Sequence, residues 1–271
     1  MQNDFNLRQL YRPVQPTVKQ AGPGVSYREI SPDDRLSSVI YCYWELKTIE
    51  KLSYPFIYRV VADGCIDIFF QLDKPSENFV MGFCKKYTEF PLENSFYYVG
   101  IRFLPTTFPL LFNINAKELS NRYERLEIVL NETSKFITEN FSIKDEFELI
   151  KLKLDTYFLN ATAKSNTSLD IRFQDALYII LKNSGVVNVQ TDLKTGLSPR
   201  QLRRYFEFYV GDTAKTFSQV VRFQNILNAK PSTQSLRNNK IFFDLGYYDQ
   251  AHFIKEFKNF YGVTPSKAFG R

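Results

Sequence analysis

The stretch that decides the fold of the C-terminal third is GYYDQAHFIKEFKNFYGVTP, residues 246–265. A weaker copy, GLSPRQLRRYFEFYVGDTA, begins at Gly196. A fixed period of this length indicates a duplicated supersecondary unit. The residues that recur at one offset of 51 positions are Phe206 and Phe257, Gly211 and Gly262, and Thr213 and Thr264.

Each copy has the order of signals expected of a helix-turn-helix motif. A turn containing Gly is followed by a polar N-cap, Ser198 or Asp249, then by an amphipathic helix and a Gly that ends it. The second helix of such a motif can enter the major groove of DNA. We therefore predict motifs at about residues 186–210 and 238–261, with short first helices at 191–195 and 241–245.

The reading helix of the first motif carries three arginines on its outer face. Leu202, Tyr205, Phe206 and Tyr209 form the buried stripe, and the opposite stripe is Arg200, Arg203, Arg204 and Glu207. A guanidinium can donate two parallel hydrogen bonds to guanine or bind a phosphate. Pro199 at the first helical position sets the entry angle of the helix, and we assign it to the DNA-binding surface with the three arginines.

The reading helix of the second motif has a less charged outer face. Its buried stripe is predicted to be Phe253, Phe257, Phe260 and Tyr261, and its outer residues are Gln250, Ala251, Lys255, Lys258 and Asn259. Gln can pair with adenine and Ala can contact a thymine methyl group. We assign Gln250, Ala251, Lys255 and Lys258 to DNA contact and expect this helix to contribute less sequence-specific affinity than the first.

A continuous helical pattern joins the two motifs over residues 213–228, with Phe217, Val220, Val221 and Leu227 on its buried side. This spacer helix should hold the reading helices at a set separation. If both enter one face of DNA, they should lie about 34 Å apart.

Charge is distributed unevenly along the chain. Residues 166–271 carry 15 Lys and Arg against 8 Asp and Glu, whereas residues 1–165 carry 20 against 21. The excess of positive charge predicts double-stranded DNA as the partner of the C-terminal part. The start of the chain lacks a signal-peptide pattern and no apolar run is long enough to span a membrane, so we expect a cytoplasmic protein without a membrane partner.

The N-terminal part has the pattern of an antiparallel β domain. Short runs of aromatic and β-branched residues alternate with turns from Val25 to about Thr106, and the clearest turn is Ala62-Asp63-Gly64. The predicted fold class is therefore α+β with two domains: a β-sandwich or jelly-roll-like N-terminal domain, a helical connector and an all-α double helix-turn-helix domain. The predicted divisions are 1–115, 116–160 and 169–271, with a helix at 144–159, a linker at 160–168, and the connector as a possible dimerisation element.

Aromatic residues of the β domain either fill its core or line a pocket for a small-molecule effector. The residues assigned to such a pocket are Trp44, Tyr58, Phe70 and Tyr98. Asp63 and Asp67 are explained as a turn residue and a strand-end residue.

No catalytic, metal or cofactor site is expected. The only His, His252, lies in the C-terminal third, and residues 1–165 contain neither a Gly-rich phosphate loop nor a nucleophile motif. Cys42, Cys65 and Cys84 form no CxxC pair, and we interpret them as small apolar strand residues rather than redox sensors.

The C-terminal third resembles the DNA-binding domain of the AraC/XylS family of bacterial transcription regulators over about residues 170–268. The residues that carry the resemblance are Gly246-Tyr247, Asp249 to Phe253, Phe257-Lys258, Gly262 to Pro265, Leu202, Arg204, Phe206, Gly211 and Arg222 to Gln224. The resemblance implies two helix-turn-helix motifs, base contacts by Arg200, Arg203, Arg204, Gln250, Ala251 and Lys255, and RNA polymerase as a further partner. The N-terminal part is more loosely similar to a cupin-like regulatory module fused to some family members.

These features predict a sequence-specific transcription regulator that responds to an effector. Two alternatives for the N-terminal domain stay open: it serves only to form a homodimer, or it is a small-molecule-binding module to which DNA binding is accessory.

Overall fold

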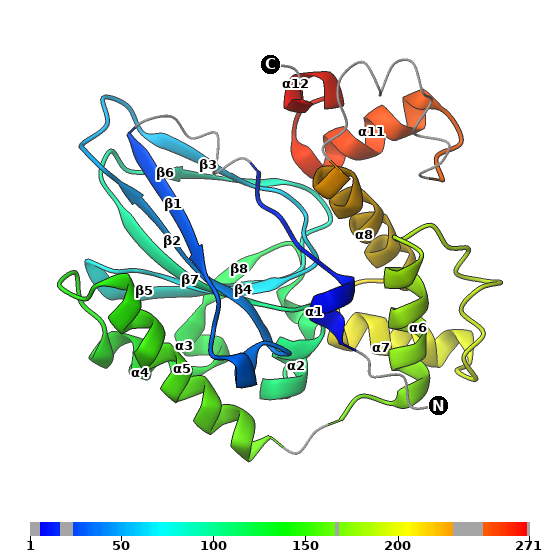
Figure 1. Ribbon diagram of the computed structural model, residues 1–271, viewed down its shortest axis with the longest axis horizontal. Coiled ribbons are helices and arrows are strands. Elements are labelled where there is room, and N and C mark those ends of the chain that lie inside the picture. Colours follow the sequence, from blue (N-terminus) through cyan, green and yellow to red (C-terminus); the bar gives the residue numbers. More distant parts are fainter. Residues whose placement is uncertain (1–5, 17–23, 166–167, 230–245, 270–271) are drawn as a thin grey trace.

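The computed structural model describes residues 6–16, 24–165, 168–229 and 246–269. A domain built on antiparallel sheets is followed by a helical C-terminal part that lies beside it (Figure 1). This arrangement confirms the predicted fold class.

Six strands form the main sheet, in the order β1-β2-β7-β4-β5-β8, and all neighbouring pairs are antiparallel. A second sheet pairs β3 with β6. The strands are β1 Val25–Ile30, β2 Ile40–Thr48, β3 Phe56–Val60, β4 Ile66–Gln71, β5 Lys74–Met81, β6 Thr88–Leu92, β7 Tyr97–Phe103 and β8 Tyr123–Arg125. Buried residues of β2 pack with Tyr58 of β3, so the small sheet covers one face of the large one.

Helices cover the other face of the main sheet. They are η2 Asp34–Leu36, α2 Thr107–Phe112, η3 Ala116–Leu119, α3 Leu126–Val129, α4 Asn131–Asn140 and α5 Phe147–Lys164. Ile137 of α4 and Leu154 of α5 belong to the same buried cluster as Ile68 and Phe70 of β4. Residues 116–160, predicted as a connector, therefore contribute a strand and much of this core. Helix α5 also continues to Lys164, into the stretch predicted as linker.

The helical part contains α6 Ile171–Lys182, α7 Pro199–Tyr209, α8 Ala214–Ala229, α11 Gln250–Tyr261 and α12 Pro265–Phe269. The helix predicted at 213–228 is present as α8, Ala214–Ala229. The short helix predicted at 191–195 is wrong, because these residues form turns. The side chain of Asp192 accepts a hydrogen bond from Asn188 N at 2.8 Å, and Gly196 has φ +86°, so local side-chain bonds and a left-handed residue replace helix. The helix predicted at 241–245 lies outside the described residues.

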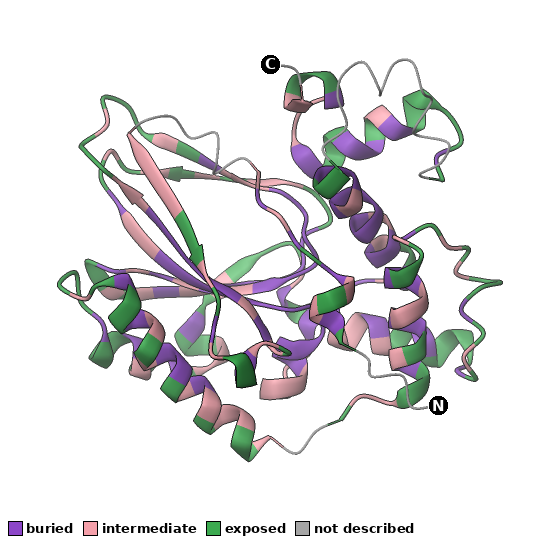
Figure 2. Cartoon of the chain, viewed as in Figure 1, coloured by how far each residue is buried: buried purple, intermediate pink, exposed green. Residues whose placement is uncertain are grey.

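Helix α8 is buried along most of its length (Figure 2). The predicted side, with Phe217, Val220 and Val221, is fully buried. Phe223 and Gln224 are buried as well, although they lie outside the predicted stripe. Phe223 is covered by α11, where its ring lies 5.4 Å from that of Phe257 and 5.3 Å from that of Phe260. Gln224 is covered by the sheet domain and by the N-terminal segment, which includes α1 Leu7–Leu10.

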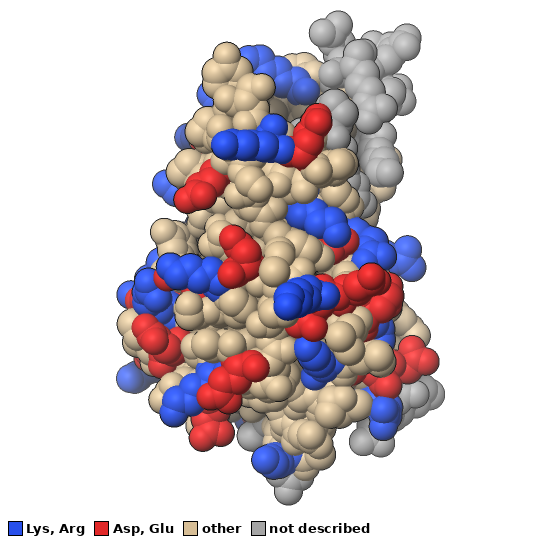
Figure 3. Space-filling view, turned by 90° about the vertical axis from the view of Figure 1, so that its left-hand side faces the viewer, with Lys and Arg blue, Asp and Glu red and all other residues tan. Residues whose placement is uncertain are grey.

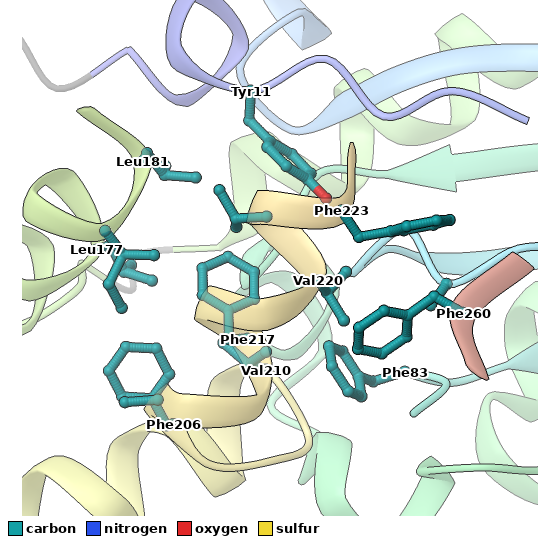
Figure 4. Packing of buried hydrophobic residues seen from close by; sticks show 14 of the residues in the cluster. Tyr11, Phe83, Leu177, Leu181, Phe206, Val210, Phe217, Val220, Phe223 and Phe260 are labelled. Atoms are coloured by element: carbon teal, nitrogen blue, oxygen red, sulfur yellow. The ribbon is translucent and has the colours of Figure 1, made fainter. Parts of the chain in front are cut away.

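One hydrophobic cluster joins the two parts of the molecule. Tyr11 of the N-terminal segment and Phe83 of the sheet domain pack around α8 with Phe217, Val220 and Phe260 (Figure 4). The Tyr11 and Phe217 rings are 6.4 Å apart. The helical part is thus fixed to the sheet domain by apolar packing as well as by hydrogen bonds.

The face of the sheet domain that is turned away from the helical part carries charges of both signs, interspersed rather than gathered (Figure 3). Such a surface has no continuous patch of positive charge along which a polyanion such as DNA could bind. Among the described helices none combines the length and the apolar character needed to cross a membrane.

Candidate nucleic-acid interface and candidate ligand pocket

Helix α7 begins as the sequence predicts. Ser198 N donates to Gln201 Oε1 at 3.0 Å, and Gln201 N donates to Ser198 Oγ at 3.3 Å, so the two residues form a capping box. Pro199 occupies the first turn. The predicted stripe is buried most deeply at Leu202 and Phe206.

The outer face of α7 exposes all four residues predicted to contact DNA: Pro199, Arg200, Arg203 and Arg204. Arg203 Nε donates to Glu207 Oε1 at 2.8 Å, and Lys117 Nζ of the sheet domain donates to Glu207 Oε2 at 2.9 Å. These two cations, Arg203 first, lower the pKa of Glu207. The Arg203 guanidinium is therefore held along the helix face by a carboxylate that also contacts the sheet domain.

Helix α11 has the predicted cap and stop. Asp249 Oδ1 accepts from His252 N at 2.7 Å, and Gly262 follows the last turn at φ +96°. All four residues that the sequence assigns to DNA contact on this helix are exposed, namely Gln250, Ala251, Lys255 and Lys258. Tyr248, 86% exposed directly before the helix, is a surface aromatic that the sequence analysis passed over.

His252 lies against Tyr247 and near Glu256. Its ring lies 5.4 Å from that of Tyr247, and its Nε2 lies 3.9 Å from Glu256 Oε2. Over the described ranges, no group of three or more His, Cys, Asp or Glu side chains is placed to hold a metal ion.

A buried ion pair ties α11 to the spacer helix. Arg222 Nη2 donates to Glu256 Oε1 at 2.8 Å and to Oε2 at 3.0 Å. Gln219 of α8 and the hydroxyl of Tyr247 also donate to the Glu256 carboxylate, at 2.8 and 2.7 Å. The same guanidinium lies 4.1 Å from the centre of the Tyr247 ring. The two charges are paired, while Arg222 Nε is buried without a hydrogen-bond partner among the described residues. The network fixes the orientation of α11 relative to α8.

The C-terminal half of α11 touches the sheet domain directly. Asn259 Nδ2 donates to Lys85 O at 2.9 Å, and Tyr87 N donates to Asn259 O at 3.1 Å. Ala62 N donates to Phe260 O at 3.2 Å. The position of this helix is therefore set by both α8 and the sheet domain.

The N-terminal segment, residues 6–16, lies between the sheet domain and α8, and we call it the arm. Gln15 Nε2 donates to Val61 O at 3.0 Å and to Asp63 Oδ2 at 2.7 Å, and Gln15 Oε1 accepts from Val61 N at 2.9 Å. The Tyr11 hydroxyl donates to Asp63 O at 2.6 Å. On the other side, Gln224 Oε1 of α8 accepts from Val14 N at 2.8 Å.

Gln224 bonds the sheet domain as well as the arm. Its Nε2 donates to Ala62 O at 2.8 Å, and the residue is completely buried. Gly64, at φ +72°, leaves room there: a Cβ would lie 3.3 Å from the Phe217 ring of α8. The turn at residues 62–64, which the sequence predicts, is thus a contact point for arm, spacer helix and sheet domain.

A cavity of about 280 Å³ lies between the two sheets. Three of the four predicted pocket residues, Trp44, Tyr58 and Tyr98, line it. Phe70 does not: it lies on the opposite face of β4, where its ring is 5.2 Å from that of Phe141. Successive side chains of a strand point to opposite faces, so Phe69 lines the cavity in its place.

Asp63 and Asp67 also line the cavity, and both contact a buried arginine. Arg102 Nη2 lies 2.9 Å from Asp67 Oδ2, and Arg102 Nε lies 3.4 Å from Asp63 Oδ2. Trp44 Nε1 donates to Asp67 Oδ2 at 3.0 Å. The pKa of Asp67 is raised to about 6: burial is the largest cause, the charge of Arg102 opposes the shift, and the charge of Asp63 adds to it. These carboxylates are part of the pocket, rather than only the turn and strand-end residues inferred from the sequence.

The three cysteines are buried and unpaired with one another. Burial raises the pKa of the Cys84 thiol to about 12 and raises those of Cys42 and Cys65 as well. A protonated, buried thiol reacts slowly, which supports their interpretation as small apolar residues. Cys42 lies within β2, whereas Cys65 lies directly before β4 and Cys84 follows β5.

Two regions of the chain match known domain families. The profile of a domain of unknown function, DUF6597, matches residues 28–125, and that of a helix-turn-helix domain family, HTH_18, matches residues 193–271. The C-terminal part is an AraC-type helix-turn-helix domain. The AraC-type domain makes the protein a DNA-binding transcription regulator.

Among solved structures, the chain is similar to ToxT from Vibrio cholerae O395, at 13% identity and TM-score 0.42, over 91% of this chain and 97% of ToxT. A ToxT structure bound to (E)-4-(8-methylnaphthalen-1-yl)but-3-enoic acid gives 14% identity and TM-score 0.41, over 90% and 97%. ToxT from Vibrio cholerae strain SCE256 with an unsaturated fatty acid bound gives 11% and 0.39, over 90% and 94%. At these values the similarity does not extend to a ligand of this chain. A comparison with curated protein sequences found no match.

Proposed function

We propose that the protein is an effector-responsive transcription regulator in which a ligand bound between the two sheets controls the DNA-binding helices through the arm. The observation that carries the proposal is the position of Asp63, which lines the cavity and hydrogen-bonds Gln15 of the arm. The neighbouring arm residue Val14 hydrogen-bonds Gln224 of the spacer helix. Pocket, arm and spacer helix are therefore consecutive in space.

DNA contact is assigned to the outer faces of α7 and α11. On α7, three guanidinium groups lie within the first two turns, where they reach base edges or phosphates. On α11, polar and lysine side chains are exposed beside a helix whose axis is fixed by the Arg222–Glu256 pair. The residues proposed to contact DNA are Pro199, Arg200, Arg203, Arg204, Gln250, Ala251, Lys255 and Lys258.

Ligand control follows from the packing of the arm. A molecule that binds against Asp63 competes with or reinforces its bond to Gln15, and so changes how firmly the arm holds α8. Because both reading helices pack on α8, a shift of this helix changes their relative position on DNA. A ligand alters DNA affinity only to the extent that it binds the two arrangements with different affinity.

The test is a DNA-binding titration of the full chain and two arm variants. Tyr11→Phe removes the hydroxyl bond to Asp63 O and preserves the ring, whereas Gln15→Ala removes all three side-chain bonds of Gln15. We expect both variants to bind DNA, with an affinity that no longer responds to ligand or responds less. An unchanged ligand response in Gln15→Ala would rule out the arm as the link between pocket and spacer helix. A loss of salt-dependent DNA binding in Arg203→Ala tests only the DNA contact and says nothing about this link.

A second role for the sheet domain, in forming a homodimer, is favoured by the outward side of α5. Leu149 and Leu152 are 44% and 61% exposed there, and Ile143 in the preceding loop is 54% exposed. Large apolar side chains at one surface often mark a protein interface. Sedimentation of the wild type and of Leu152→Glu distinguishes a dimer through α5 from a monomer, which would show the same mass for both proteins.

A further inference from the structure

The cavity between the sheets combines aromatic walls with negative charge. Trp44, Tyr58, Phe69 and Phe90 are among the ring side chains around it, and the charged residues that line it are both acidic, Asp63 and Asp67. Among the residues that the structure describes, no Lys, Arg or His lines the cavity. An anionic ligand would therefore have to lose its water against two carboxylates without a cation in direct contact, which is strongly unfavourable.

A buried cation nearby, Arg102, does not balance this charge. Arg102, 1% exposed, is 2.9 Å from Asp67, 3.4 Å from Asp63 and 3.7 Å from Glu29. Three carboxylates thus share one guanidinium. Its Nη1, which has no hydrogen-bond partner among the described residues, is the atom nearest Glu29, and Arg102 itself is not part of the cavity wall.

The carboxylates retain capacity to accept hydrogen bonds. Asp67 Oδ1 accepts from Arg102 Nε at 3.2 Å, and Asp63 Oδ1 accepts from Cys65 N at 3.0 Å. Each carboxylate oxygen can accept two hydrogen bonds, so one position on each of these atoms is available to a donor. Aromatic faces beside a carboxylate are the surroundings in which proteins bind organic cations.

We propose that this cavity binds a small organic amine, with the ammonium group on Asp63 and Asp67 and the apolar body against the aromatic walls. The inference rests on the proposed function in one respect: it names the class of the ligand that would act as the effector. The charge of the cavity, from which the class is argued, does not depend on DNA binding. A cation at this point also contacts the carboxylate that holds Gln15 of the arm.

The fluorescence of Trp44 provides a direct test, because it is the one Trp of the chain and lines the cavity. Three probes of matched shape differ in charge: 2-phenylethylamine, 2-phenylethanol and 3-phenylpropionate. Each is titrated into the full chain with tryptophan excited at the red edge of its absorption. We expect the amine to change the emission saturably and to bind about tenfold or more tighter than the alcohol, because hydrogen bonds to charged groups are the stronger ones. The acid should bind weakest.

The variant Asp67→Asn provides the second part of the experiment. It should weaken the amine about tenfold and change the affinity for the alcohol less than about twofold. The proposal is overturned if the acid binds as tightly as the amine, if the amine gives no saturable change, or if the wild type and Asp67→Asn bind the amine equally. The comparison of probes on the wild type decides the question even if the variant does not fold.

DNA affinity measured in the same samples separates this proposal from the regulatory one. Amine binding without any change in DNA affinity would support the amine site and contradict the proposed control of DNA binding through the arm. If the Trp44 emission and the DNA affinity both responded to the acid but not to the amine, the proposed control through the arm would be supported and the amine site would be contradicted.

Discussion

Replacement of Gln224 by Leu should loosen the arm from the spacer helix with little change of shape. The side chain is completely buried, accepts from Val14 N at 2.8 Å and donates to Ala62 O at 2.8 Å. Leu has no polar group, so the amide of Val14 and the carbonyl of Ala62 would each lose their bond to this side chain.

The expected loss can be worked out from these two short bonds, since the third bond of the side chain, from Nε2 to Val14 O, is 3.4 Å long. An intramolecular hydrogen bond contributes about 1 kcal/mol net, and a buried polar group left unpaired costs about 1–3 kcal/mol. Two such groups give an expected fall of roughly 2–6 kcal/mol in the free energy of unfolding.

The assay is urea denaturation followed by far-UV circular dichroism, with Asn225→Ala as the control. Asn225 lies on the same helix, but its side chain bonds Val221 O of that helix. The control should lose less than about 1 kcal/mol. A loss in Gln224→Leu that is no larger than in the control would refute the role assigned to this side chain.

Three further predictions concern the reading helices and the pocket. Arg203→Ala should cost about 1–3 kcal/mol in DNA binding and relax specificity at one base pair, with a smaller loss for Lys255→Ala; equal or reversed losses in anisotropy titrations would overturn this ranking. Glu256→Ala should cost about 3–5 kcal/mol in the free energy of unfolding, because it leaves the charge of Arg222 buried and unpaired; Glu256→Gln, which keeps hydrogen-bonding atoms, should cost less, and equal costs would contradict the account. Because folding raises the pKa of Asp67 to about 6, the folded state binds the proton more tightly, and stability should fall by roughly 2–3 kcal/mol as the pH rises from about 4 to about 7. Urea midpoints of Asp67→Asn should lack this part of the pH dependence, and parallel curves would show that Asp67 does not cause it.

The reading helices could be predicted from the sequence because their signals are local. The cap Ser198, Pro199 after it and the stop Gly262 define the helix ends within a few residues. At 191–195 the same reasoning fails, because Asp192 satisfies backbone groups of the loop rather than of a helix.

Prediction of the residues that line the pocket required information that the pattern of a single strand does not contain. Phe69 and Phe70 are adjacent aromatics, and either choice of face satisfies the alternation of β4. The pairing of Asp67 with Arg102 depends on the register of β4 and β7, which joins residues 35 positions apart. Opposite charges inside two apolar strand patterns, CIDIFF and GIRF, were the available signal.

The contacts of the arm could not be predicted from the sequence, for a related reason. Residues 6–16 have little periodicity, and the bond from Val14 to Gln224 spans 210 positions of the chain. Gln224 lies outside the apolar stripe of its helix, so its burial follows only from what packs against α8.

Selection of bound duplexes from random DNA by the full chain, followed by anisotropy titrations of the enriched sequence at several salt concentrations, tests the central claim most directly. The account predicts an enriched site with two elements about one helical turn, roughly 34 Å, apart, and an affinity that falls steeply with salt as phosphate contacts are screened. It also predicts that Arg203→Ala loses preference for one element and Lys255→Ala for the other. Recovery of no common sequence, or an affinity that does not depend on salt, would contradict it.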